Sequence, residues 1–192
     1  AIQDNSGNST LQPGDVKYSD LNNDGIIDIK DQQVFGNGNK PAYNYSLNLS
    51  MDYKRLSVGV LLTGAFGYDI YLGGEAQAAL RNNFNGYTYQ MDYWTEENPD
   101  ARFPRVSDGG FNENNYRYSD FWMRNGTHLR LRNVNVSYSA PEKMSDFLGF
   151  TDLRFTFTGF NLHVFKAFSE EFDPQMQTDL GWYYPQLKSH SL

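Results

Sequence analysis

The sequence predicts an all-β fold of antiparallel strands from a transmembrane β-barrel with long extracellular loops, of which this chain contains only a part. Aromatic residues make up 16% of a chain that is polar on average, as expected where a barrel exposes only alternate side chains to lipid. Apolar and polar residues alternate through residues 43–53. Short turns and long loops also alternate along the chain, and membrane barrels carry these two kinds of connection at opposite ends.

Composition excludes several other classes of protein. No run approaches the roughly 20 consecutive apolar residues of a membrane-spanning helix. With 23 acidic and 16 basic side chains the formal charge is −7, which argues against nucleic-acid binding because that binding relies on basic surfaces. The absence of cysteine excludes disulfides, thiolate metal sites and cysteine nucleophiles. Residues 1–13 lack the pattern of a signal peptide, so we expect this N-terminus to lie inside a longer chain.

Residues 1–42 are predicted to form a surface loop that binds calcium. The residues at positions 1, 3, 5, 7, 9 and 12 of an EF-hand-type loop are Asp20, Asn22, Asp24, Ile26, Asp28 and Asp31. Calcium takes six to eight hard oxygen ligands, here side-chain oxygens and the carbonyl of Ile26, and Gly25 permits the sharp turn at position 6. An Asp at position 12 has a shorter arm than Glu, so a modest affinity is expected. The predicted ion is structural; the alternative is an Asn- and Asp-rich turn that holds no ion.

Residues 43–72 are predicted to form a hairpin. Apolar and aromatic residues alternate with polar ones from Tyr43 to Tyr53, which gives the first strand one apolar and one wet face. The length suits the roughly 9–11 residues of a tilted membrane strand, and Tyr at both ends suits the aromatic girdles of the interfaces. A soluble sheet with one solvated face would show the same alternation. A tight turn at Lys54 and Arg55 leads into the second strand.

Residues 73–120 are predicted to form a long extracellular loop, within which residues 75–82 suit a short helix. Uninterrupted loops of this length are uncommon in compact domains. Membrane barrels make them routinely, so the loop favours the barrel over a soluble sandwich.

Residues 121–192 are predicted to contain the last strands and a further loop. The first strand-like stretch changes phase near Arg132 or Asn133, which indicates a bulge. A connector with about one helical turn leads to a strand at residues 153–165. A loop at about 166–185 precedes the start of another strand.

Few other residues indicate chemistry. His128, His163 and His190 lack the spacing of a metal or catalytic site and are expected in the barrel wall or in loops. Glu170 and Glu171 would suit glycoside hydrolysis as paired carboxylates, but acidic residues are common in surface loops.

Aromatic and basic residues allow two interpretations each. Side chains that would stack on sugar rings or serve in interfacial belts are Trp94, Trp122, Trp182, Tyr87, Tyr89 and Tyr93. Arg130 and Arg132 are expected to line the lumen or to pair with acidic loop residues rather than to bind substrate.

Six motifs follow one another along nearly the whole chain. They are PGDVKYSDLNNDGIID, GNGNKPAYNYSLNLSMDYKRLSVGVLLTGAFGYDIY, YWTEENPDARFPR, SDFWMRNGTHLRLRNVNVSYSAP, LRFTFTGFNLHVF and YPQ. In order and spacing this set resembles the C-terminal portion of SusC/RagA-family TonB-dependent outer-membrane transporters. The resemblance implies a large barrel of roughly 22 strands with an internal plug, in the outer membrane of a Gram-negative bacterium of the Bacteroidetes type.

The resemblance also implies a non-enzymatic importer of glycans or peptides. Proteins of this family work with a SusD-like surface lipoprotein and use energy delivered through TonB, which would act through an N-terminal part missing here. Outer-membrane lipid would surround the strands. The alternatives are a secreted calcium-stabilised carbohydrate-binding β module and a fragment of a surface glycosidase.

Overall fold

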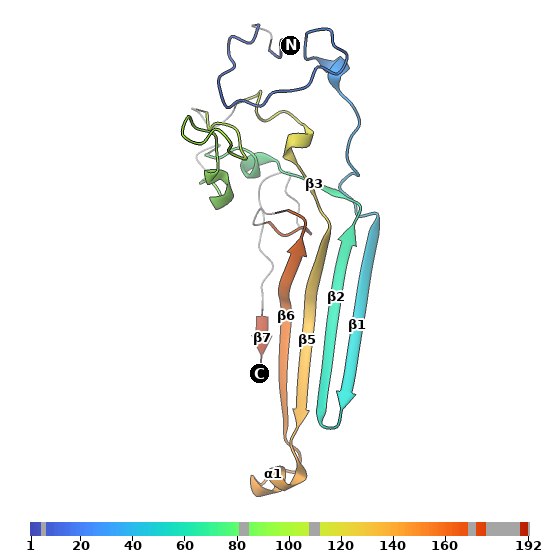
Figure 1. The fold of residues 1–192 in the computed structure, drawn as a ribbon. Coiled ribbons are helices and arrows are strands. Elements are labelled where there is room, and N and C mark those ends of the chain that lie inside the picture. The colour runs from blue at the N-terminus through green and yellow to red at the C-terminus, as the bar shows by residue number, and fades with distance from the viewer. Residues whose placement is uncertain (5–6, 81–84, 108–111, 169–171, 176–188, 192) are drawn as a thin grey trace. The chain divides into compact units, whose positions relative to one another are not determined.

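The computed structural model describes residues 1–4, 7–80, 85–107, 112–168, 172–175 and 189–191 (Figure 1). The chain divides into two compact units. We call the first the loop unit; its described residues lie within Ala1–Gly36 and Tyr71–Met123. We call the second the strand unit; its described residues lie within Asn37–Ile70, Arg124–Met176 and Tyr184–Leu192.

The strand unit is an antiparallel sheet of five strands (Figure 1). These are β1 (Tyr43–Tyr53), β2 (Leu56–Phe66), β5 (His128–Ser139), β6 (Arg154–Lys166) and β7 (Ser189–Ser191), paired in the order β1-β2-β5-β6-β7. The predicted all-β, antiparallel fold is thus confirmed. The strand expected near the end of the chain is present as β7.

A two-residue turn joins β1 to β2, as predicted. Lys54 adopts the left-handed conformation with a φ of 55°, which the favoured two-residue hairpin turns require. The Arg55 guanidinium donates a hydrogen bond of 2.6 Å to the carbonyl of Ala140, and the Ser139 amide donates one of 2.9 Å to the Arg55 carbonyl. These bonds tie the hairpin turn to the end of β5.

β5 carries the predicted bulge. Leu61 pairs with Asn133 and Leu62 pairs with Leu131, so Arg132 has no partner in the pairing with β2. The pairing with β6 is irregular at the same level. An extra residue turns the following side chains to the other face of the sheet, which explains the change of phase in the sequence.

The remaining elements are short. They are η1 (Ile29–Asp31), β3 (Asp69–Tyr71), η2 (Gly74–Ala76), η4 (Thr88–Met91), η5 (Asp120–Trp122), β4 (Met123–Asn125) and α1 (Glu142–Phe147). β3 and β4 form a two-stranded sheet, and α1 confirms the predicted helical turn. The helix suggested for residues 75–82 is present, in its described part, only as the 3-10 turn η2, because Gly74 and Leu80 have positive φ angles of 57° and 61°. No helix among the described residues is long and apolar enough to span a membrane.

Polar side chains form much of the core of the loop unit. Trp122 is fully buried, and its indole N–H donates a hydrogen bond of 2.8 Å to the carbonyl of Asn115. The Asp15 carboxylate accepts a hydrogen bond of 2.9 Å from the side-chain amide of Asn115, and it forms an ion pair with Arg105, whose Nε lies 2.7 Å away. Buried polar groups need such partners. This network fixes the segment that precedes the predicted calcium loop against the segment that leads to Trp122.

Candidate functional site

One face of the sheet in the strand unit is predominantly apolar along its whole length, and we call it the wall. By register, its apolar side chains are Tyr43, Tyr45, Leu47, Leu49, Met51, Tyr53, Leu56, Val58, Val60, Leu62, Phe66, Leu129, Leu131, Val134, Val136, Tyr138, Phe155, Phe157 and Phe165. Those of β1 are large, yet 39% to 61% exposed. Soluble monomers rarely expose a continuous apolar patch of this extent, whereas lipid-facing strands do so as a rule.

Aromatic residues mark both ends of the wall. Tyr53, Leu56, Tyr138 and Phe155 are successive partners across four strands and form one row. At the other end the rings of Tyr43 and its partner Phe66 stack at 4.7 Å. Such rows are typical of the two membrane interfaces.

The spacing of the two rows fits a membrane. Tyr43 and Tyr53 are the first and last residues of the 11-residue strand β1. At about 3.4 Å per residue and a strand tilt of about 40°, the rows lie roughly 25 Å apart along the membrane normal. This is the height of the apolar band of outer-membrane barrels, about 25 Å.

A glycine in the wall accommodates a tyrosine that crosses the sheet. A Cβ atom on Gly64 would collide with the Tyr45 ring. The Tyr45 hydroxyl donates a hydrogen bond of 2.9 Å to the carbonyl of His128 on β5. Gly64 therefore lets Tyr45 tie β1 to a strand that is not its neighbour.

The opposite face of the sheet carries mainly short polar side chains. On β1 these are Asn44, Ser46, Asn48, Ser50 and Asp52. The Asn135 amide donates to the Thr158 hydroxyl, and the hydroxyls of Ser137 and Thr156 are hydrogen-bonded, both at 3.1 Å. Polar inner faces of this kind line the lumen of membrane barrels.

A buried group of polar side chains lies near the polar face, at the end of the sheet where the long connections begin. We call this group the polar cluster; its members are Tyr68, His128, Arg130 and Asp173. Arg130 is 1% exposed, and its Nη2 lies 2.7 Å from each carboxylate oxygen of Asp173. This is the pairing with an acidic loop residue that we expected for Arg130. The Tyr68 hydroxyl donates to the Pro174 carbonyl at 2.9 Å and lies 3.1 Å from His128 Nδ1.

The polar cluster holds a neutral phenol beside an ion pair. Burial, and secondarily the charge of Asp173, raises the pKa of Tyr68 to about 12. The phenol therefore stays protonated and remains a hydrogen-bond donor at physiological pH. Together these groups fasten residues 172–175 to the start of β5.

The predicted calcium loop, residues 20–31, is folded by hydrogen bonds to its own backbone. The Asp20 carboxylate accepts a bond of 2.8 Å from the Gly25 amide, and Gly25 has a φ of 87°, as the sharp turn requires. The Asp31 carboxylate accepts bonds of 2.8 Å from the amides of Leu21 and Asp28. The first and last acidic residues of the motif thus both anchor the loop backbone.

Two acidic side chains of this loop have a lowered pKa, and two face a cation of the chain itself. Hydrogen bonding from the Ile26 amide lowers the pKa of Asp24, and hydrogen bonding from the Asp28 amide lowers that of Asp31. Lys30 Nζ lies 3.5 Å from the Asp24 carboxylate and 3.8 Å from that of Asp28. Positive charge is therefore already attracted to this part of the loop.

The donor set of the loop fits calcium in chemistry and order. All its side-chain donors are oxygens, which hard cations require. Asp20 Oδ1 is buried without a hydrogen-bond partner, whereas Asn22 Oδ1 accepts from the Asp24 amide at 2.9 Å. Among the described residues, no three acidic or imidazole groups converge closely enough to hold a metal ion. Binding would therefore require the carboxylates to turn toward a common centre.

The aromatic candidates are used largely inside the protein. Trp122 lies in the core of the loop unit rather than on a binding surface. Trp94 covers Gly14, where an added Cβ would collide with the indole. The rings of Tyr87 and Tyr89 stack at 5.6 Å.

The histidines do not form a common site. His128 belongs to the polar cluster, His163 lies on the wall 4.4 Å from the Phe165 ring, and His190 lies in β7. Three further candidates fall outside the described residues: Glu170, Glu171 and Trp182.

Two groups of functional residues were missed by sequence reasoning. Tyr68 and Asp173 join Arg130 through contacts between residues distant in sequence, and no local pattern marks them. Asp15 lies within the PGD motif, but its partners Arg105 and Asn115 lie 90 and 100 residues away.

The chain is similar to two curated proteins of Formosa agariphila. It is 29% identical to TonB-dependent receptor P26 over an alignment of 156 residues, which covers 81% of this chain and 16% of that protein. It is 24% identical to TonB-dependent receptor P3, over 84% of this chain and 16% of that protein. The chain thus spans about a sixth of the length of these relatives. No family model matches it.

A solved structure shares the fold. A chain of the RagAB peptide importer in its closed-closed state superimposes with a TM-score of 0.53 and 17% identity, over 79% of this chain and 17% of that chain. The comparisons confirm the resemblance to TonB-dependent receptors that the motifs indicate. They also confirm the fold class, antiparallel strands of a transmembrane β-barrel.

Proposed function

We propose that this chain is part of a TonB-dependent importer in the outer membrane of a Gram-negative bacterium. The observation that carries the proposal is the wall, with its aromatic rows about 25 Å apart, in a chain similar to TonB-dependent receptors over most of its length. The wall faces lipid, and the polar face lines the lumen. The strands then serve as a scaffold, and the protein is not an enzyme.

The polar cluster would act on the lumenal side of this scaffold. The Arg130–Asp173 pair fastens residues 172–175 to β5 without exposing charge to lipid. A transported molecule passing this point would meet no unpaired charge from Arg130, because that side chain is buried and paired with Asp173. The role of the cluster is thus to fix a loop rather than to bind the cargo by charge.

The complete importer would work with a SusD-like surface lipoprotein and carry glycans or peptides. The similarity to a chain of the RagAB peptide importer supports the fold required for such a partnership. Energy would arrive through TonB by way of a part of the protein outside this chain.

We also propose that residues 20–31 bind a structural calcium ion. The side-chain oxygens of Asp20, Asn22, Asp24 and Asp31 would hold it, with the Ile26 carbonyl and with Asp28 directly or through water. The buried, unpartnered Oδ1 of Asp20 supports this assignment. Bound calcium would supply positive charge to an acidic loop and hold it ready for the lipoprotein or the substrate.

The test uses the full-length receptor in its native cells. Uptake of fluorescent oligosaccharides and oligopeptides should depend on the receptor gene and stop when a protonophore collapses the energy supply. Affinity purification in detergent should co-purify a surface lipoprotein. A full-length protein that stays in aqueous solution without detergent, with uptake unchanged on deletion of its gene, would instead favour a secreted calcium-stabilised carbohydrate-binding module.

A further inference from the structure

The connector between β5 and β6 exposes a compact apolar surface. α1 is followed by Leu148 and Phe150, and the exposed apolar residues are Met144 (43%), Phe147 (88%), Leu148 (48%) and Phe150 (54%). Met144, Phe147 and Leu148 are spaced i, i+3 and i+4, so they share one face of the helix. Figure 1 shows α1 at the end of the strands.

This connector is fixed by backbone hydrogen bonds. The Ala140 amide donates to the Leu153 carbonyl at 2.7 Å, which closes the base of the connector. The Phe150 amide donates to the Ser145 carbonyl at 2.9 Å, and Ser145 is buried. The apolar side chains are therefore held in place on the surface instead of folding inward.

The helix is amphipathic despite its length. Glu142 and Asp146, both exposed, lie one turn apart on the side opposite Met144. One side thus prefers water and the other prefers an apolar environment. Helices of this character lie at the boundary between lipid headgroups and acyl chains.

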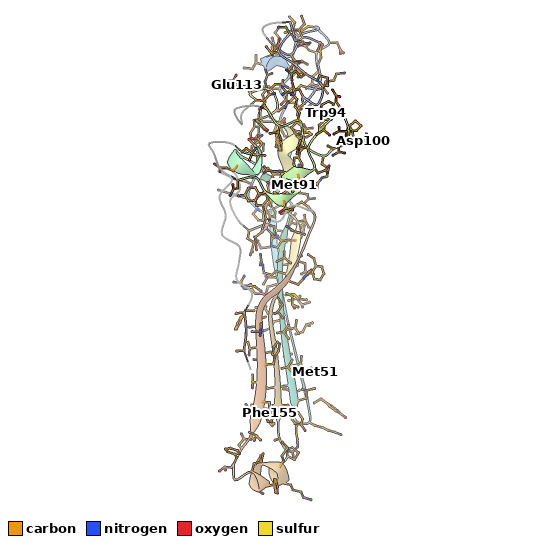
Figure 2. The ribbon with its side chains drawn as sticks, turned by 90° about the vertical axis from the view of Figure 1, so that its left-hand side faces the viewer. Met51, Met91, Trp94, Asp100, Glu113 and Phe155 are labelled. Atoms are coloured by element: carbon orange, nitrogen blue, oxygen red, sulfur yellow. The ribbon has the colours of Figure 1, made fainter. Side chains whose placement is uncertain are left out.

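The connector begins and ends beside one border of the wall. The aromatic row Tyr53–Leu56–Tyr138–Phe155 borders this end of the sheet. Tyr138 lies just before the connector and Phe155 just after it, and Figure 2 shows Phe155 and Met51 toward the same end of the strands. Since the row marks a membrane interface, the connector lies at the level of the lipid headgroups.

We propose that Met144, Phe147, Leu148 and Phe150 form a membrane foot, which inserts into the interface of the leaflet on the short-turn side. The occupant of this surface is phospholipid, because the connector adjoins the aromatic row that borders the lipid-facing wall. The carboxylates of Glu142 and Asp146 face water. The foot sets the depth at which β5 and β6 sit in the bilayer. This inference rests on the proposed membrane function.

The test is photo-cross-linking in the full-length receptor in the outer membrane of expressing cells. The photoreactive residue p-benzoylphenylalanine replaces Phe147, and in a matched control it replaces Glu142. Mass spectrometry should find phospholipid adducts at position 147 in several-fold higher yield than at position 142. Heat-modifiable electrophoretic migration checks that each variant is a folded barrel.

A third position separates this inference from the proposed function. The same photoreactive residue at Leu49, in the middle of the wall, should form lipid adducts if the strands span a membrane. Adducts at Leu49, combined with polypeptide adducts or none at position 147, would overturn the foot alone. Absence of lipid adducts at both positions would overturn the membrane function as well.

Discussion

An arginine placed in the middle of the wall should destabilise the barrel far more than one placed next to it on the polar face. Leu49 lies six residues from Tyr43 and four from Tyr53, and its partner on β2 is Val60. At about 3.4 Å per residue and a tilt of about 40°, it lies roughly 10 Å from the level of the nearer aromatic row. The change Leu49→Arg therefore puts a cation near the bilayer midplane.

The magnitude follows from this depth. Arginine at the midplane of a barrel's lipid face costs about 2–4 kcal/mol, and near the interfaces about 0–1 kcal/mol. The first range corresponds to a factor of about 30 to about 700 in the folding equilibrium. Ser50 pairs with Gly59 on the polar face, so Ser50→Arg should cost much less. Tyr53→Arg, at the interface, should fall between zero and the midplane value.

The assay is urea titration of the full-length receptor folded into phospholipid vesicles, with each variant compared at the same lipid composition. The expected order of destabilisation is Leu49→Arg, then Tyr53→Arg, then Ser50→Arg. Equal costs at Leu49 and Ser50 would contradict the assignment of the two faces. A cost at Tyr53 as large as that at Leu49 would contradict the depth derived from the aromatic rows.

Three further changes test other parts of the structure. Asp173→Asn removes the charge that pairs with buried Arg130. Because breaking a buried ion pair costs about 3–5 kcal/mol, amide hydrogen exchange should rise first around residue 173. Unchanged exchange there would refute the pairing. Gly64→Val should displace the Tyr45 ring and crowd the His128 carbonyl, and so lower the thermal midpoint. The loss should be smaller in a Tyr45→Ala background, where only the clash with the carbonyl remains. Fully additive losses would argue against the contact with the ring. Asp24→Ala should abolish calcium uptake in calorimetry while leaving the strands folded, and no uptake by the unmutated protein at millimolar calcium would end the assignment. The folded loop lowers the pKa of Asp24. The stabilisation of the loop by ionised Asp24 is therefore complete above the ordinary pKa of about 4 and is lost as the pH falls through the lower pKa of the folded state. The loop should thus loosen only in acid.

Local periodicity made the strands predictable, and contacts between distant residues were not. The alternation in residues 43–53 predicts both the extent of β1 and its apolar side, because side chains on a strand alternate between two faces. The bulge at Arg132 was visible for the same reason. The Arg130–Asp173 pair joins residues 43 positions apart, and no periodic signal links them.

The calcium loop shows the limit of a motif. Spacing predicted the acidic residues that organise the turn, and Asp20 and Asp31 do anchor it. Spacing did not predict that Lys30 lies against Asp24 and Asp28. Whether these carboxylates bind a metal ion or pair with a lysine depends on competition between the two cations. The spacing of residues in a motif gives no information about that competition.

The two units depend on different sources of stability, and this follows from their composition. In the strand unit, alternate large apolar side chains are exposed, so under the proposed function lipid would supply their apolar surroundings. In the loop unit, Asp15, Arg105 and Asn115 replace much of an apolar core with hydrogen bonds and an ion pair. Such a network keeps its strength only when every polar group has a partner. The wall therefore tolerates exchange of one apolar residue for another, whereas the loop unit is sensitive to single polar substitutions. A loop ordered in this way can present a defined surface to a partner in water.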